Sequence, residues 1–89
     1  MEEELLRVSA GSAPQAVASA IAHAIYESNH VKIRAVGAGA VNQAIKAIAI
    51  ASGYTAPRGI SLACVPGFQT ISGNDGDISA IVITVFSRS

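Results

Sequence analysis

A glycine-rich segment, Gly37-Ala38-Gly39, links a stretch of alternating apolar residues to a long run of alanine and isoleucine. Such a turn from a strand into a helix can bind an anion, because the first backbone N–H groups of a helix have no acceptor within it. A dinucleotide-binding fingerprint needs a third glycine where Asn42 stands, and a P-loop needs its lysine closer to the turn than Lys46. Two interpretations therefore stay open: a tight turn that packs the helix closely on the sheet, or a simple anion site.

Few other residues have the types and spacing of a reactive or metal-binding site. Cys64 lies among apolar residues with no base near it in the sequence, so we expect a core thiol rather than a nucleophile. His23, Glu27 and His30 have a helical spacing that could bind zinc. His30 falls beyond the expected end of the helix, however, and a solvated helix face is the simpler interpretation.

Two carboxylates, Asp75 and Asp77, are close enough in the sequence for acid–base chemistry. They lie in a predicted exposed turn, where aspartate is favoured for its local hydrogen bonding. No convincing catalytic set is present. We therefore expect no enzyme activity, no cofactor and no metal site.

The composition describes one small domain, residues 1–89, with an unusual surface. Half of the residues are apolar (51%), only 13% are charged, and the formal net charge is zero. So few charges leave apolar surface for a partner to cover, and the basic excess of a strong nucleic-acid binder is missing. The single cysteine and the acidic N-terminus predict a cytoplasmic protein without a signal peptide, and no apolar run reaches the length of a membrane span.

Hydrophobic periodicity predicts six elements in the order βαβαββ. The strands are expected at residues 5–9, 31–36, 60–68 and 78–86, and the helices at 14–27 and 40–52, ending at Asn29 and Gly53. Right-handed crossovers then place both helices on one face of a four-stranded mixed sheet, an α+β two-layer sandwich. Pro66 predicts an edge position for the third strand. The expected core is Val8, Val17, Ile21, Ile25, Ile33, Val41, Ile45, Ile48 and Val82.

The last strand is apolar on both faces, which predicts that both faces are covered. The helices cover one face, so a second subunit is expected to cover the other. This predicts a homodimer or homotetramer with an interface that includes Ile50, Ile81, Ile83 and Val85.

Three segments, AVGAGAVNQAIKAIAIASGYTAPRGI, LLRVSAGSAPQAVASAI and LACVPGF, resemble the bacterial stage V sporulation protein S family, and the resemblance extends over about Leu5 to Val85. It implies a cytoplasmic protein that influences sporulation, with an Alba-like fold, the sheet order 1-2-4-3 and a last strand antiparallel to the rest. Alba proteins are dimeric nucleic-acid binders with the same order of elements.

The chain departs from the charge pattern that this resemblance implies. Alba proteins carry lysines in the loop before the first helix, which here is residues 9–13, and arginines around the loop before the second, where Gly37 and Gly39 stand. Their hairpin is a basic arm, whereas this one holds two aspartates. Members of the sporulation family commonly carry Lys where Gly11 stands and Arg where Ser52 stands. The scaffold is kept and most of its charge is lost.

Both turns before the helices and the hairpin tip are expected at one edge of the sheet. A weak contact with DNA or RNA there would use Arg7, Ser12, Lys32, Arg34, Gly37, Gly39, Asn42, Gln43 and Lys46. The three cations on the strands are expected on the face of the sheet away from the helices. Two alternatives stay open. The cations could be solvated or pair with Glu2, Glu3 and Glu4, and the protein could be a structural or regulatory oligomer that binds a protein partner.

Overall fold

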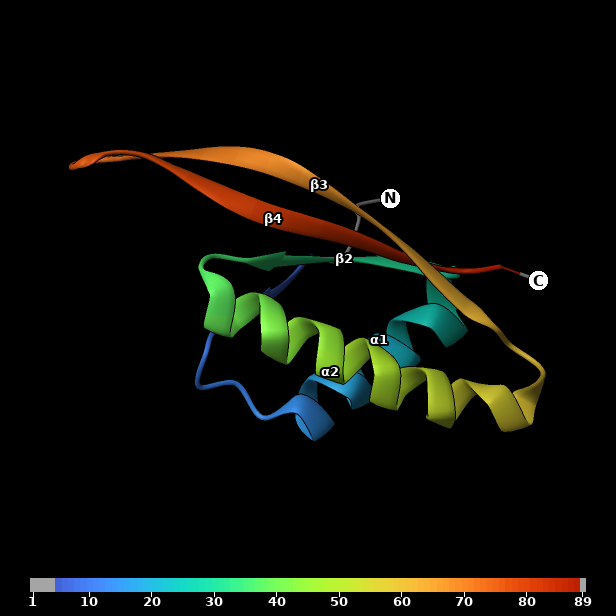
Figure 1. Cartoon of the computed structure of the whole chain (residues 1–89). Coiled ribbons are helices and arrows are strands. Elements are labelled where there is room, and N and C mark those ends of the chain that lie inside the picture. Colours follow the sequence, from blue (N-terminus) through green and yellow to red (C-terminus); the bar gives the residue numbers. More distant parts are fainter. Residues whose placement is uncertain (1–4, 89) are drawn as a thin grey trace.

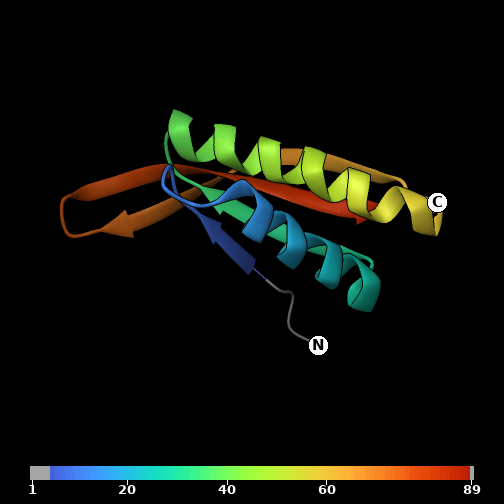
Figure 2. The same ribbon diagram turned by 90° about the horizontal axis from the view of Figure 1, so that it is seen from below.

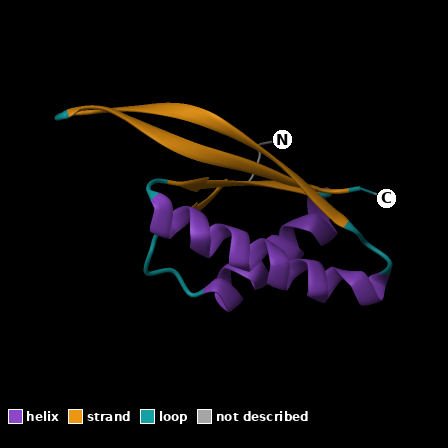
Figure 3. Cartoon of the chain, viewed as in Figure 1, coloured by secondary structure: helices purple, strands orange, loops and turns teal. Residues whose placement is uncertain are grey.

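The chain alternates between strand and helix and then ends in a long hairpin (Figure 1, Figure 3). In the computed structural model, residues 5–88 are described. The elements are β1 (Leu5–Val8), α1 (Pro14–Ser28), β2 (His30–Ala35), α2 (Ala38–Thr55), the short 3₁₀ helix η1 (Ala56–Arg58), β3 (Leu62–Gly73) and β4 (Gly76–Ser87). The predicted order βαβαββ is confirmed.

The strands form one sheet in the order β1-β2-β4-β3, as predicted. β1 pairs with β2 in parallel, and β4 pairs antiparallel with both β2 and β3. Both helices lie on one face of the sheet and pack against each other (Figure 1, Figure 2). β1 and β3 are the edge strands, which agrees with Pro66 in β3.

Local signals explain where α1 begins and ends. Pro14 occupies the first turn, where its missing N–H costs no hydrogen bond. Ile21 and Ile25, four residues apart, are buried against the sheet. Asn29 ends the helix with a φ of 67°, and its N–H donates to the carbonyl oxygen of Ile25.

α2 passes through Gly53, the residue that the sequence suggested as its end, and continues to Thr55. A glycine inside a helix costs about 1 kcal/mol relative to alanine. Thr55 is buried, and its hydroxyl donates to the carbonyl oxygen of Ile60 at 3.0 Å. The chain turns only at Gly59, where φ is 76°.

Alanine, more than isoleucine, forms the inner face of α2. The buried residues of this helix are Ala40, Ala44, Ala47, Ala51 and Thr55. The isoleucine and valine stripe lies one residue later at nearly the same spacing, so Val41 and Ile48 are half-buried and Ile45 is 48% exposed. The prediction that Ile45 is core was wrong.

Of the other expected core residues, five lie between the helices and the sheet and one lies on the opposite face of the sheet. Val8, Ile21, Ile25 and Ile33 are buried as predicted, and Val17 is half-buried against them. Val82 was predicted as core, but it is only half-buried on the face opposite the helices, in register with Arg34.

Two residues predicted for the subunit interface belong to the core of the single chain. Ile83 is 2% exposed and Val85 is 0% exposed, because both point toward the helices. They are not available to a partner, and that prediction was wrong. Ile50 and Ile81 are half-buried against the same core.

The β3–β4 hairpin is longer than the rest of the sheet. The last pair between β2 and β4 is Ala35 with Ile81, so residues 69–80 pair only with each other. We call residues 69–80 the hairpin arm, and it projects past the end of β2 (Figure 1). Phe68, at the base of the arm, is 85% exposed. Cys64 is exposed on the edge strand, which corrects the prediction of a core thiol.

Candidate functional site

Because β1 and β2 are parallel, their carboxyl ends lie side by side at the same end of the sheet. Each strand leads from there into a helix that returns along the same face. We call this region the loop end: the last two residues of β1 and of β2, residues 9–13, residues 36–37 and the first two turns of α1 and α2. It contains Ser12, Gly37, Gly39, Asn42 and Gln43, which the sequence proposed for one site.

The loop that leads into α1 is fixed on itself and on α2. The N–H of Ser9 donates to the side-chain oxygen of Ser12 at 2.9 Å, and the N–H of Ser12 donates to the carbonyl oxygen of Ser9 at 3.1 Å. The side-chain amide of Gln43 donates to the carbonyl oxygen of Ser12, also at 2.9 Å. The loop is therefore a rigid part of the fold.

The two glycines of the second turn have different roles, one in backbone conformation and one in packing. Gly37 has a φ of 89°, a left-handed value that glycine adopts without strain. A Cβ atom on Gly39 would lie 3.0 Å from the Cβ of Ala10, so glycine allows the loop and the helix to touch. This supports the tight-turn interpretation, and it also brings the two helix starts together.

Neither helix start has a side-chain cap. The N-cap residues are Ala13 and Gly37, and the first turns contain no acidic residue. The first intrahelical bond of α2 runs from Val41 to Gly37, so the N–H groups of residues 38–40 have no acceptor within the helix. Such a start favours a negative charge nearby.

Two arginines lie at the same end on the opposite face of the sheet. Arg7 and Arg34 are paired in the β1–β2 register, one residue before each strand ends. Neighbouring strands are about 4.8 Å apart, so the two side chains start as close neighbours. Like charges at this spacing repel, and an anion between them relieves the repulsion. Lys32 lies on the same face, two residues before Arg34.

Lys46 and Asn42 are less central than the sequence suggested. Both are exposed on α2, but Lys46 lies about two turns from the start of the helix. The loop end thus combines the hydrogen bond from Gln43 to Ser12, the two uncapped helix starts and the Arg7–Arg34 pair. Lys46 lies at its margin.

The charges of the described residues are unevenly distributed. Glu2, Glu3 and Glu4 lie outside the described residues, and so does any pairing of the cations with them. Residues 5–88 therefore carry six Lys and Arg against three Asp and Glu. Asp75 and Asp77 are exposed on the hairpin arm, which extends beyond the loop end (Figure 1). The loop end is basic and the tip beside it is acidic.

The histidines are not brought together. Nε2 of His23 lies 3.2 Å from a carboxylate oxygen of Glu27, whereas Nδ1 of His30 lies 3.0 Å from the carbonyl oxygen of Ser28. Within residues 5–88, no three His, Cys, Asp or Glu side chains gather in a group that could hold a metal ion. In the same range, no helix combines the length and apolarity that a membrane span needs.

Sequence reasoning missed several exposed apolar side chains. Val65, Phe68 and Ile78 are exposed on the hairpin, and Ile45 is exposed on α2. Val65 is in register with Thr84 on the face of the sheet away from the helices. For Ile78, in the arm, the signal was the length of the hairpin, which has 12 residues in each strand against 6 in β2. A hairpin of that length extends past the helices that cover the sheet.

At the opposite end of the molecule, a second set of contacts joins the helix ends. The Tyr26 hydroxyl donates to the carbonyl oxygen of Tyr54 at 3.3 Å. The Arg58 guanidinium lies 3.8 Å from the centre of the Tyr26 ring. This cation–π contact holds η1, which follows α2, against α1.

The fold and the sequence both match known proteins. The fold is similar to that of Alba from Thermoplasma volcanium, with a TM-score of 0.64 over 93% of this chain and 99% of that chain. The sequence identity is 18%, so this likeness shows the fold alone. The model of the family described as stage V sporulation protein S matches residues 4–88. The chain therefore belongs to the stage V sporulation protein S family.

Proposed function

We propose that this chain is a small cytoplasmic regulatory protein that binds DNA or RNA weakly, and without sequence preference, as a homodimer or larger homo-oligomer. Membership in the stage V sporulation protein S family and the Alba-like fold support a small regulatory protein. One observation carries the binding proposal: the loop end joins the Arg7–Arg34 pair to two uncapped helix starts.

These groups can donate hydrogen bonds to phosphate oxygens, but they do not distinguish one base from another. Arginine side chains and bare backbone N–H groups donate to phosphate oxygens, and such contacts carry no sequence information. A nucleic-acid backbone repeats its phosphates, so one strand crossing the loop end can reach both faces of the sheet. A protein with few Lys and Arg side chains at its binding surface displaces few counterions from the nucleic acid. Its affinity for nucleic acid is therefore low and falls as salt is added.

The dimer surface is the flank of α2 that faces away from α1, together with the exposed side of β3. Gln43 faces the loop before α1, and Ile45, two residues later, lies about 200° further round the helix. Phe68 is in register with Ile81, so it shares the helix side of the sheet. We infer that a second copy covers Ile45 and Phe68, because such exposed apolar groups mark an interaction site.

A protein partner in place of nucleic acid is the second candidate. The acidic tip of the hairpin arm favours it, since Asp75 and Asp77 repel phosphate where a nucleic-acid strand would pass. Exposed Val65 and Ile78 on the same hairpin would then contact that partner.

Charge removal at the arginine pair tests the proposal. Arg7→Gln and Arg34→Gln should each weaken binding to labelled single-stranded RNA and duplex DNA alike, measured by fluorescence anisotropy. Arg88→Gln is the matched control, because Arg88 is exposed near the C-terminus and its backbone N–H, not its side chain, donates to Ser61. Equal losses in all three variants would show that net charge, and not the loop end, drives the binding.

A further inference from the structure

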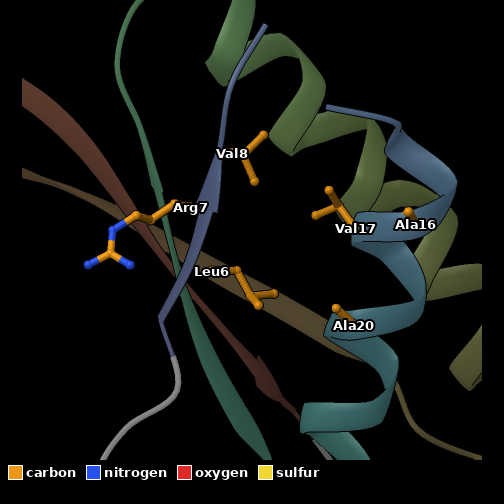
Figure 4. Close-up of a pocket in the computed structure, with 6 residues that line it drawn as sticks. All are labelled: Leu6, Arg7, Val8, Ala16, Val17 and Ala20. Atoms are coloured by element: carbon orange, nitrogen blue, oxygen red, sulfur yellow. The ribbon is translucent and has the colours of Figure 1, made fainter. Parts of the chain in front are cut away.

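A cavity of about 220 Å³ lies between β1 and α1, open on one side (Figure 4). Leu6 and Val8 line it from the strand, and Ala16, Val17 and Ala20 line it from the helix. The small alanine side chains leave this space. Five of the six lining residues are apolar, and the sixth, Arg7, directs its side chain away from the cavity (Figure 4). We call this cavity the β1 slot.

The β1 slot lies beneath an open strand edge. β1 is the first strand of the sheet order and has β2 as its neighbour on one side. On its other side, the described part of the chain places no strand. The backbone donors and acceptors of an edge strand can pair with another extended chain.

If an extended segment of another chain pairs with β1, the two faces of the strand favour different side chains in that segment. Side chains alternate between the faces of a strand, so every second residue of an added strand would enter the β1 slot. The residues between them would lie beside Arg7, whose side chain points away from the slot (Figure 4). Arg7 already has Arg34 as its neighbour on β2, so a carboxylate on its open side is favoured and a third cation is not.

We propose that the β1 edge and the β1 slot bind an extended segment of a partner protein in which apolar residues alternate with acidic ones. A second copy fits poorly through residues 5–8, because its outward side chains there are Leu5 and Arg7, and a second Arg7 would add a cation to the pair. The site does not depend on nucleic-acid binding at the loop end, although Arg7 borders both.

Three synthetic peptides of about seven residues test the recognition rule. One alternates valine with glutamate, one alternates valine with lysine, and one has the composition of the first with its valines grouped together. The first should bind and shift the backbone NMR signals of Leu5–Val8, and each of the others should bind roughly tenfold more weakly or worse. Equal binding of all three, or binding of none, overturns the proposal.

Variants of the full chain locate the site. Ala20→Leu fills the β1 slot and should weaken the valine–glutamate peptide roughly tenfold while leaving the melting temperature unchanged or higher. Ser19→Leu, on an exposed part of the same helix, should change neither. Arg7→Glu should reverse the preference, so that the valine–lysine peptide binds better.

The same variants distinguish peptide binding at the β1 edge from nucleic-acid binding and from self-association. Ala20→Leu should leave RNA and DNA binding intact, so a failure here does not affect the loop end. If Ala20→Leu instead dissociates the native oligomer and no peptide binds, a second copy occupies the edge and the proposal is wrong. It is also wrong if Arg7→Glu weakens both alternating peptides equally.

Discussion

The side-chain nitrogen of Gln43 on α2 lies 2.9 Å from the carbonyl oxygen of Ser12, 31 residues away in the sequence, in the loop before α1. This hydrogen bond joins the starts of the two helices. It holds in place the groups that we propose to meet phosphate.

Removing that bond should weaken stability and binding together. Gln43→Ala should lower the free energy of unfolding by about 1 kcal/mol, the usual net value of one hydrogen bond, and weaken nucleic-acid binding. Gln43→Glu should weaken binding more, because a carboxylate cannot donate to Ser12 and repels phosphate. Urea denaturation and anisotropy measure the two effects. Asn42→Ala, at an exposed neighbouring position, is the control for stability. An equal loss in its free energy of unfolding would contradict the role of Gln43.

The contact between Gly39 and Ala10 predicts an unusual response to alanine. Gly39→Ala should destabilise the chain by about 1 kcal/mol, because the Ser9–Ser12 hydrogen bonds keep Ala10 from moving away, and this outweighs the higher helix propensity of alanine.

Two comparisons isolate that clash. Ala10→Gly combined with Gly39→Ala should restore the stability. Gly53→Ala, in the same helix with nothing within 4 Å of the new Cβ, should stabilise the protein by about 0.5–1 kcal/mol. A stabilising Gly39→Ala would show that the loop yields easily. Thermal unfolding followed by circular dichroism distinguishes these results.

Ile83 and Phe68 should respond differently to lysine. Ile83→Lys places a charge in the core of the single chain and should prevent folding. Phe68→Lys should leave the far-ultraviolet circular dichroism spectrum unchanged and convert the dimer to a monomer. Gln69→Lys, the exposed neighbour on the opposite face, should remain dimeric. Light scattering on the three proteins reports the mass, and a native protein that is a stable monomer would end the dimer proposal.

Reversing charge on the hairpin arm should strengthen nucleic-acid binding. Asp75→Lys combined with Asp77→Lys removes two carboxylates beside the loop end and adds two cations there. Each new phosphate contact should steepen the logarithmic salt dependence by about 0.9. The position of the charge is checked by comparing Asp75→Lys with Glu27→Lys, at the far end of α1. If the two single variants gain equally, the arm has no special place in binding.

Periodicity predicted the order of elements and the faces of β1 and β2, because alternation along these strands leaves one choice of which side is buried. It gave the wrong face for β4, which is apolar on both faces, so that Ile83 and Val85 rather than Val82 face the helices. It failed in α2, where an alanine stripe from Ala40 and an aliphatic stripe from Val41 have nearly the same spacing. Side-chain size favoured the aliphatic stripe, but α1 packs closely on α2, and alanine allows the closer approach. Cys64 was misplaced because Pro66 indicates an edge strand, but no local pattern shows that this edge lies beyond the cover of the helices.

The candidate site was predictable in part. Parallel strands bring both turns to one end of the sheet, so the meeting of the turn at Ser12 with the turn at Gly37 followed from the order of elements. The bond from Gln43 did not, since it joins residues that no local pattern relates. Strand alternation placed Arg7 and Arg34 on one face, but their direct pairing depends on the β1–β2 register, which no local pattern sets.

The central claim is that the loop end binds nucleic-acid phosphates. Its most direct test is a titration of the native protein against DNA and RNA between about 50 and 200 mM salt. We predict micromolar binding to both, with little sequence preference and a slope of log affinity against log salt of about −2 to −4 per dimer, at about −0.9 per phosphate. No binding to either nucleic acid at micromolar protein and low salt would contradict the claim, and the protein-partner candidate would then take its place.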